Sequence, residues 1–288
     1  MENTHNLTEQ PLADAWATLQ SHANKGTLLE QGAHRLAFAD PEFLLRREVR
    51  GIRMQLEMLK PELGQAALGV EHTIVVFGGA RFCSPEAAQA ALHQAQSGND
   101  AQALANAQRL VRNAPYYTQA REFGRLVAEH STSCAAADKL FICTGGGPGV
   151  MEAANRGAHD AGAPSVGLSI ALPREEGANP FVTPELSFQF HYFAMRKMHF
   201  MMRAKALVAF PGGFGTLDEL FEVLTLVQTR KAKPVPIFLY GSAYWKRLIN
   251  FDALVEEGAI SAQDTQLFSY VDDPLSTWNA IKAFYSLA

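Results

Sequence analysis

The strongest constraint on this chain is an alternation of short apolar runs with longer helical segments, which begins at residue 73 and continues to the end. Thr73–Phe77 is apolar, rich in β-branched residues and followed by two glycines, as expected for a buried strand that leads into a tight turn. Strands that alternate with helices of ten or more residues are typical of βαβ units. The sequence therefore predicts an α/β fold with a doubly wound, mostly parallel sheet and helices on both faces. Further strands are expected at 140–144, 165–170, 186–191, 207–210, 236–240 and, as an edge, 270–271, with helices at 150–161, 195–204 and 217–228, near Trp245 and Leu254, and from about Pro274.

The part of the chain before this pattern is predicted to be a helical N-terminal arm, residues 1–70, ahead of a main domain at 71–288. Residues 1–39 are polar and rich in alanine, which indicates a loosely helical or partly disordered stretch. Asp40 and Pro41 are typical of a helix N-cap and first helical residue, and Pro61 is expected to end that helix.

A helical insertion is predicted at about 84–114, after the first strand. Its boundaries are marked by proline, glycine and asparagine, which interrupt helices for different steric reasons. We expect a first helix that opens at Ser84-Pro85, a break at Gly98-Asn99, a second helix over 100–112, an end at Pro115 and a third helix over 116–130.

Two glycine clusters stand where a predicted strand ends and a helix begins: 144–149 (TGGGPG) and 211–216 (PGGFGT). Glycine lacks a Cβ, so backbone N–H groups at such a turn can approach an anion closely, and the helix N-terminus adds a partial positive charge. Glycine also serves tight turns for steric reasons alone, but two such loops in one sheet favour a phosphorylated ligand. No Gly-Lys-Ser/Thr follows either cluster, and neither fits a dinucleotide fingerprint, so a P-loop and a Rossmann dehydrogenase are both disfavoured.

Three polar residues follow these loops. Glu219 stands three residues after Thr216, which is a capping-box spacing, so it is either a cap of its own helix or a carboxylate that faces a bound sugar. Glu152 lies in the first turn of the helix after the other loop, where a dipole role competes with contact to a sugar hydroxyl. Asn155 lies one turn further on and is a candidate for the same contact.

Arg196 and Lys197 are predicted to begin a helix. Positive charge at a helix start is opposed by the helix dipole, so another interaction is expected to favour these residues there. The two interpretations of Arg196 are a surface ion pair and a contact with the ligand or with Glu219. Asp218 is interpreted as a helix-dipole acid. His191 and His199 have no ligand-like spacing and are expected in core or surface roles, as is Cys143 at the end of a strand.

The composition excludes several classes of protein. The net charge is −4, and no Lys/Arg run exceeds three residues, which disfavours nucleic-acid binding. Three cysteines without a C-x-x-C motif indicate reduced thiols rather than a disulfide scaffold or a zinc site. The N-terminus lacks the pattern of a signal peptide, and no apolar run approaches the ~20 residues of a membrane span, so a cytoplasmic protein is expected, with no membrane partner.

The motifs together resemble one known family. The segments TIVVFGGAR, TGGGPGVMEAANRGA, MRK and PGGFGTLDELFEVLTLVQT, which begin at residues 73, 144, 195 and 211, are similar to the LOG (Lonely Guy) family, whose members were often labelled lysine decarboxylases. The resemblance runs from about residue 73 to the C-terminus and includes a complete P-G-G-x-G-T-x-x-E pattern. The chain departs from many relatives at Gly79, where they carry serine, and in its N-terminal arm and insertion.

The resemblance implies a Rossmann-like, dimeric or higher-order homo-oligomeric enzyme that hydrolyses the N-glycosidic bond of a nucleoside 5′-monophosphate, with AMP and cytokinin nucleotides as candidate substrates. No cofactor is expected, and the lack of a His/Cys/Asp cluster with ligand spacing predicts that no metal is needed. Nothing in the residues supports Lys197 as a Schiff-base lysine for decarboxylation. The alternative is a non-catalytic carrier of a nucleotide or of molybdenum cofactor, and a weaker one is a nucleotide-sensing regulator. The implied catalytic residues are Arg196 and Glu219, and the expected substrate-binding residues are Gly79, Arg81, Gly145, Gly146, Gly147, Glu152, Asn155, Gly212, Gly213, Gly215 and Thr216.

Overall fold

The computed structural model describes residues 14, 17, 21, 35–171 and 177–287. Most of the stretch expected to be loosely helical or partly disordered, 1–39, lies outside these residues. By its internal contacts the chain divides into two compact units, Met1–Leu56 and Glu57–Ala288. The described part of the first unit holds 3₁₀ turns at Ala37–Ala39 and Arg47–Val49, the short helix α2 (Pro41–Leu44) and the start of α3 (Arg50–Ala67).

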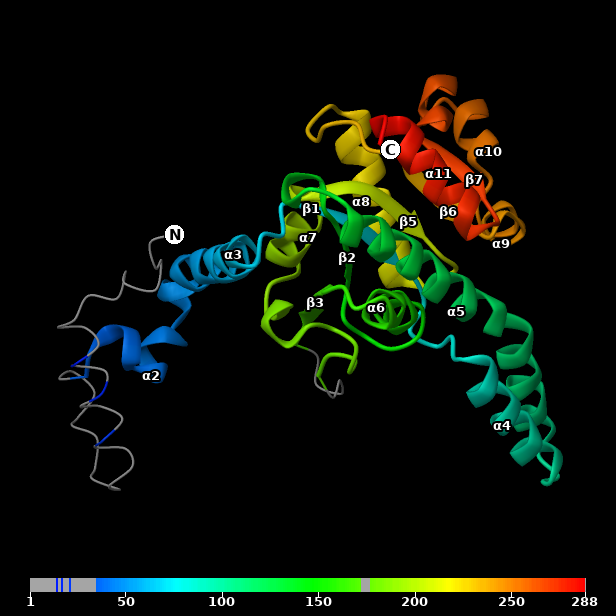
Figure 1. The fold of residues 1–288 in the computed structure, drawn as a ribbon, viewed down its shortest axis with the longest axis horizontal. Coiled ribbons are helices and arrows are strands. Elements are labelled where there is room, and N and C mark those ends of the chain that lie inside the picture. Colours follow the sequence, from blue (N-terminus) through cyan, green and yellow to red (C-terminus); the bar gives the residue numbers. More distant parts are fainter. Residues whose placement is uncertain (1–13, 15–16, 18–20, 22–34, 172–176, 288) are drawn as a thin grey trace. The chain divides into compact units, whose positions relative to one another are not determined.

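The second unit contains a seven-stranded sheet in which every pairing is parallel, in the order β4-β3-β2-β1-β5-β6-β7. This confirms the predicted doubly wound α/β fold. The strands are β1 (His72–Phe77), β2 (Leu140–Thr144), β3 (Val166–Ile170), β4 (Ser187–Phe190), β5 (Ala204–Ala209), β6 (Ile237–Tyr240) and β7 (Phe268–Val271). The helices are α4 (Pro85–Gln96), α5 (Ala101–Ser133), α6 (Val150–Asp160), α7 (Phe193–Met202), α8 (Phe214–Gln228), α9 (Ser242–Leu248), α10 (Phe251–Glu256) and α11 (Pro274–Tyr285) (Figure 1).

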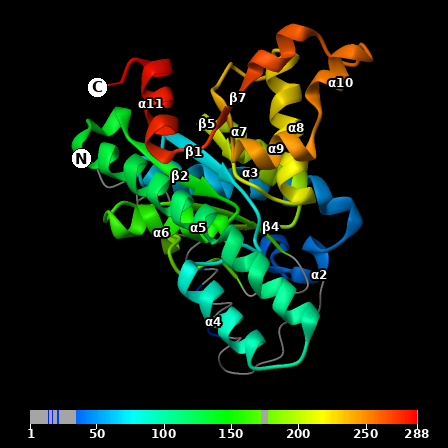
Figure 2. The same cartoon turned by 90° about the vertical axis from the view of Figure 1, so that its right-hand side faces the viewer.

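Helices cover both faces of the sheet because side chains of each strand point alternately to either side. Along β1, Val75 and Phe77 join a core with residues of α7 to α10, whereas Ile74 and Val76 join a core with residues of α5, α6 and α11. Figure 2 shows α5, α6 and α11 on one side of the strands and α8 and α10 on the other. The strands are thus buried on both faces, which explains their continuous apolar sequences.

Two prolines that were expected to end helices lie inside helices instead. Pro61 is inside α3, which continues to Ala67, and Pro115 is inside α5, an unbroken helix of 33 residues. A proline removes one backbone donor and strains one turn, but tertiary packing can hold the helix together on both sides of it. The predicted second and third helices are therefore one helix, and α4 packs along its first half (Figures 1 and 2).

The predicted caps are confirmed. The Asp40 side chain accepts hydrogen bonds from the backbone N–H groups of Glu42 and Phe43. Ser84 accepts one from Ala87 at the start of α4. No helix in the described part of the chain is both long and apolar enough to cross a membrane.

Candidate functional site

The strand order of the sheet reverses between the neighbouring strands β1 and β5. The chain builds β2, β3 and β4 outward on one side of β1 and then returns to place β5 on its other side. In open α/β sheets the carboxyl ends of strands at such a switch point border the ligand crevice. Three loops meet there: Gly79 donates from its N–H to the Pro211 carbonyl at 2.9 Å, and Val150 donates to the Gly79 carbonyl at 3.2 Å.

The first glycine loop, 144–149, requires glycine for its own geometry. Gly146 and Gly149 have φ angles of +71° and +77°, a region that side chains rarely adopt. A Cβ on Gly149 would also lie 2.4 Å from the Gly79 carbonyl oxygen. These glycines therefore let the turn after β2 pack directly against the turn after β1, and a side chain at Gly149 would separate them.

Asn155 supports this loop from behind. Its side chain is fully buried, and its Oδ1 accepts hydrogen bonds from Thr144 Oγ1 at 2.7 Å and from Asn179 Nδ2 at 3.0 Å. Its Nδ2 donates to Ser165 Oγ at 3.0 Å. The expectation that Asn155 contacts a sugar is not supported by this position, because the amide is enclosed and already hydrogen-bonded.

Asn179 completes the support and was not anticipated from the sequence. Its Nδ2 lies within hydrogen-bond distance of the carbonyls of Gly146 and Gly147, and its backbone N–H donates to Gly146 at 2.7 Å. Thr144 Oγ1 in turn accepts from the Gly146 N–H. Asn179 stands in an irregular segment without periodicity, so no local pattern indicated that it reaches the loop.

Glu152, in the first turn of α6, is half-buried and accepts a hydrogen bond from the Tyr117 hydroxyl at 2.7 Å. Burial, and then this bond to a carboxylate, raise the pKa of Tyr117. Both sequence interpretations of Glu152 therefore omitted its actual partner, which is supplied by α5. A tyrosine 35 residues earlier gives no local signal of this contact.

The second glycine loop, 211–216, differs from the first because two of its glycines are not required by packing. A Cβ on Gly213 or on Gly215 would meet no atom within 4 Å, and both residues are exposed with φ outside the left-handed region. At Gly212, by contrast, a Cβ would lie 2.1 Å from Thr216 Oγ1. Tyr244 fixes this end of the loop by donating from its hydroxyl to the Gly212 carbonyl at 2.6 Å.

The helix that follows this loop presents free backbone donors. The N-cap of α8 is Gly213, with no side-chain cap, and the first intrahelical bond of the following turn runs from the Leu217 N–H to the Gly213 carbonyl. The N–H groups of 214–216 therefore have no acceptor within the helix. Together with the helix dipole, they form a local environment suited to an anion.

Arg196 and Glu219, the two expected catalytic residues, are in direct contact. Arg196 Nη2 donates to Glu219 Oε1 at 2.7 Å, and the side chains are 10% and 12% exposed. Because α8 begins at Phe214, Glu219 is its sixth residue and does not cap the helix. The capping alternative is therefore wrong, and so is the interpretation of Arg196 as a surface ion pair.

The environment of Glu219 changes its acidity. Burial, which penalises the charged carboxylate, raises its pKa to about 7, although Arg196 acts in the opposite direction. Burial dominates because the carboxyl group is enclosed, and the negative charge of Asp218 raises the pKa of Glu219 further. A carboxyl group of this kind exchanges its proton near neutral pH, which suits a general base or acid.

Neighbouring groups hold this pair in place. The Arg196 guanidinium lies over the rings of Phe193 and Phe200, 5.0 Å and 5.7 Å from their centroids. Its Nε is buried and makes no hydrogen bond to the described residues. Lys197 binds Asp218 at 2.9 Å and Glu222 at 2.8 Å, so Asp218 acts in an ion pair rather than only on the helix dipole.

The remaining expected residues lie at the same edge of the sheet but have simpler surroundings. Arg81 is exposed in the turn after β1. Gly145 and Gly147 are half-buried, and a Cβ on either would contact Met151 at 3.0 Å or less. Within the described residues, no group of three or more His, Cys, Asp and Glu side chains is placed to hold a metal ion.

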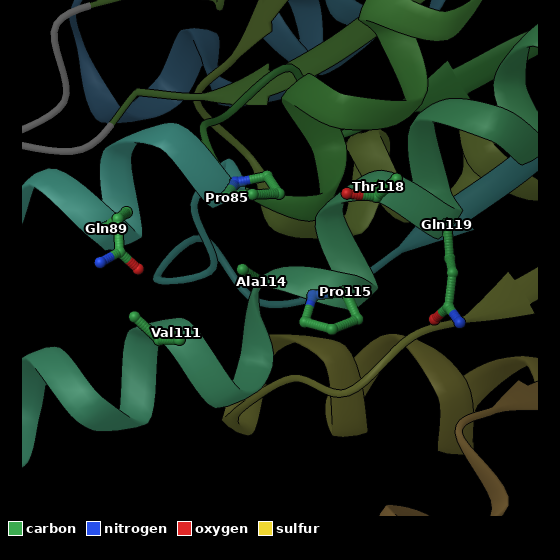
Figure 3. Close-up of a pocket in the computed structure, with 7 residues that line it drawn as sticks. All are labelled: Pro85, Gln89, Val111, Ala114, Pro115, Thr118 and Gln119. Atoms are coloured by element: carbon green, nitrogen blue, oxygen red, sulfur yellow. The ribbon is translucent and has the colours of Figure 1, made fainter.

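A separate groove of about 430 Å³ lies between α4 and α5 (Figure 3). Pro115 forms part of its wall, where α5 continues past the proline. None of the residues expected to bind substrate lines it, so it is not part of the candidate site. Its lining is Pro85, Gln89, Val111, Ala114, Pro115, Thr118 and Gln119.

Comparison with known proteins found a matching protein family, named relatives and similar solved structures. Residues 151–281 match a protein family described as "Possible lysine decarboxylase". The chain is 32% identical over 136 residues to "Probable cytokinin riboside 5′-monophosphate phosphoribohydrolase LOG4" of Oryza sativa subsp. japonica, which covers 46% of this chain and 58% of that protein. It is 34% identical over 131 residues to the protein named LOG4 of Arabidopsis thaliana, covering 44% and 59%. The chain thus matches less than two thirds of the length of these relatives.

Among solved structures, the fold is similar to that of a Moco carrier protein from Chlamydomonas reinhardtii, with 20% identity and a TM-score of 0.46, over 76% of this chain and 99% of that one. The family match spans both Arg196 and Glu219. The sequence matches thus agree with the resemblance that the motifs indicated, over part of the chain.

Proposed function

From the relationship to the LOG family and the buried Arg196–Glu219 pair, we propose that this protein hydrolyses the N-glycosidic bond of a nucleoside 5′-monophosphate. The products are the free base and ribose 5-phosphate. The observation that carries the proposal is the carboxyl group of Glu219, with a pKa near neutrality, one helical turn beyond a loop suited to a phosphate.

The second glycine loop supports the phosphate end of this proposal. Gly213 and Gly215 have space for a side chain within the protein itself, so their lack of one is explained by the close approach of a ligand. The N–H groups of 214–216 and the Thr216 hydroxyl would bind the 5′-phosphate. The helix rises about 4.5 Å from Thr216 to Glu219, and this separation supports a carboxyl group near the sugar of a nucleotide whose phosphate binds the loop.

At the sugar of the substrate, hydrolysis of the glycosidic bond needs a negative charge and a water molecule. Cleavage of the bond between C1′ and the base leaves the electron pair on the base, which also takes up a proton, and builds positive charge on the sugar. An ionised Glu219 stabilises that charge or removes a proton from the water whose oxygen attacks C1′. Arg196 holds the carboxylate in position through its Nη2.

In line with the names of the relatives, we propose that the base is a purine or a cytokinin-type purine. We also propose that the protein is a homodimer or a higher homo-oligomer, in line with the family resemblance. Binding of a nucleotide without turnover would instead favour the carrier alternative.

The test is release of free base from purified protein, with a panel of nucleoside 5′-monophosphates and the corresponding nucleosides. We expect AMP or another monophosphate to be cleaved at least about 100-fold faster than its nucleoside, because binding of the non-reacting phosphate orients the sugar. Equal rates on nucleotide and nucleoside would contradict the phosphate assignment. Nucleotide binding with no release of base from any member of the panel would contradict the hydrolase assignment.

Glu219→Gln separates catalysis from binding. The substitution keeps the shape of the side chain but removes its charge, so base release should fall about 10²–10⁴-fold while nucleotide binding persists. The matched control is Asp218→Asn on the same helix, whose exposed carboxylate pairs with Lys197 and which should retain most of the rate. A Glu219→Gln protein that turns over near the normal rate would disprove the role of Glu219.

A further inference from the structure

The start of α7 is capped by a carboxylate from a distant part of the chain. The N-cap residue Tyr192 makes no cap bond with its own side chain. Instead, Glu57 of α3 accepts hydrogen bonds from the backbone N–H groups of His191 at 2.8 Å, through Oε1, and of Tyr192 at 3.1 Å, through Oε2. Both oxygens of Glu57 are thus used at the positive end of the helix that carries Arg196.

The backbone of the same residue makes a second contact with α7. Pro61 has no N–H, so the carbonyl of Glu57, four residues earlier, lacks its usual helical donor. His199 of α7 fills this position, with its Nε2 at 3.1 Å from that carbonyl oxygen. The ring is buried, and its Nδ1 makes no hydrogen bond in the described part of the chain, which assigns the proton to Nε2.

The end of α7 is fixed to the same segment. Arg203, its C-cap, donates to both carboxylate oxygens of Glu62 at 2.5 Å and 2.8 Å, and to the Val70 carbonyl at 2.7 Å. The helix is therefore held at its start, in its middle and at its end by residues 57–70. A bidentate contact of this kind adds directional precision to the attraction of opposite charges.

A short chain of hydrogen bonds connects Glu57 with the candidate catalytic pair. Glu57 holds the Tyr192 N–H, the Tyr192 carbonyl accepts from the Arg196 N–H at 3.2 Å, and Arg196 Nη2 reaches Glu219. The first turn of a helix frays most easily, because its N–H groups lack partners within the helix. Without the carboxylate of Glu57, the turn that orients Arg196 would lose its external acceptors.

We propose that Glu57 is a positioning residue that caps α7 and thereby holds Arg196 against Glu219. The effect of Glu57 on base release rests on the proposed function, whereas its effect on the contact between Arg196 and Glu219 does not. Because Arg196 lowers the pKa of Glu219, the ionisation of Glu219 reports how closely the guanidinium is held. The other groups that act on Glu219 are Lys197 of α7, Asp218 and Glu222 of α8 and the Cys143 thiol of β2.

The experiment compares the full chain with Glu57→Ala, Glu57→Gln and the control Glu48→Gln, which removes the same charge from an exposed residue of the first unit. Three quantities are measured: amide hydrogen exchange at His191, Tyr192 and Arg196, the carboxyl ¹³C titration of Glu219, and kcat and KM for base release. In Glu57→Ala we expect exchange about 5- to 10-fold faster, a higher pKa of Glu219 and kcat lower by about tenfold with KM changed less than about twofold.

Glu57→Gln should lie closer to the unmodified protein, because its amide oxygen still accepts one N–H, and Glu48→Gln should match the unmodified protein. The Gln variant carries the test if Glu57→Ala does not fold. Unchanged exchange, or faster exchange with an unchanged Glu219 titration, would overturn the proposal. A protein that releases no base would overturn the proposed function alone, since exchange and titration would still decide the role of Glu57.

Discussion

Glu219 shows how one residue gains its chemistry from its surroundings. A carboxyl with an ordinary pKa is ionised at neutral pH and holds a proton weakly, whereas burial raises the pKa of Glu219 to about 7. We therefore expect kcat for base release to rise about tenfold per pH unit below about pH 7 and to level off above it, because the ionised form is the catalytic one. A pH–rate profile measures this, and a flat profile between pH 5 and pH 8 would contradict it.

Two neighbouring charges provide controls of opposite sign for that profile. Asp218 raises the pKa of Glu219 and Lys197 lowers it. Asp218→Asn should therefore move the rising limb to lower pH, and Lys197→Met should move it to higher pH. Shifts in the same direction would show that the limb belongs to another group.

The same pKa has a consequence for stability. As pH rises above about 4.5, Glu219 loses its proton in the unfolded chain first, because its pKa in the folded protein is higher. The contribution of Glu219 to the free energy of unfolding is therefore fully present below about pH 4.5 and is lost as pH rises through about 7. The melting temperature of the unmodified protein, relative to that of Glu219→Gln, should fall across this window.

At the scale of elements, the close crossing of α5 and α6 depends on two glycines. A Cβ on Gly124 would lie 2.2 Å from the Ala154 carbonyl oxygen, and one on Gly157 would lie 1.9 Å from that of Arg121. Backbone atoms cannot move away without separating the helices, and α6 begins at the first glycine loop. The crossing therefore links helix packing to the position of that loop.

Gly157→Ala should reduce the free energy of unfolding by about 3 kcal/mol or more, because the added methyl group overpacks a backbone contact. The matched control is Gly51→Ala in helix α3, where a Cβ would meet nothing within 4 Å. There, better helix propensity should increase the free energy of unfolding by up to about 1 kcal/mol. Chemical denaturation measures both, and equal effects of the two substitutions would contradict the packing argument.

At the scale of the whole molecule, residues that precede the first strand pack into the main domain. We propose that the main domain needs residues 57–70, although the strand–helix pattern starts only near residue 71. Val70 is fully buried, Gln65 nearly so, and Phe188 of β4 packs against Gly64. The division of the chain by contacts, between Leu56 and Glu57, agrees with this position of the boundary.

A chain that begins at Glu57 should therefore keep its melting temperature within a few degrees of the full protein. A chain that begins at Glu71 should lose about 3 kcal/mol or more of its free energy of unfolding, or about 10 °C in Tm, because it loses buried side chains and the Glu62–Arg203 pair. Calorimetry of the two shortened proteins is the measurement. Equal stability of both would place the boundary at 71.

Much of the molecule could be predicted from local sequence because local physics decides it. Continuous β-branched runs of five or six residues form strands that are buried on both faces, and Asp40 and Ser84 cap the helices that they precede. The glycine loops stand out because each joins a strand to a helix at one edge of a parallel sheet. The motifs themselves then indicated Arg196 and Glu219 through the resemblance to the LOG family.

Other features depend on contacts between residues far apart in the sequence, so tertiary structure alone decided them. Helices α3 and α5 continue past Pro61 and Pro115, and the carbonyl freed by Pro61 finds His199, 142 positions later than its own residue. Glu219 became a buried partner of Arg196 rather than a cap, because α8 begins two residues before Thr216. The sequence by itself determined most of the strands and helices, and it determined where the glycine loops join strands to helices. The packing of those elements decided which polar groups meet, because burial and hydrogen-bond geometry depend on atoms that local sequence does not bring together.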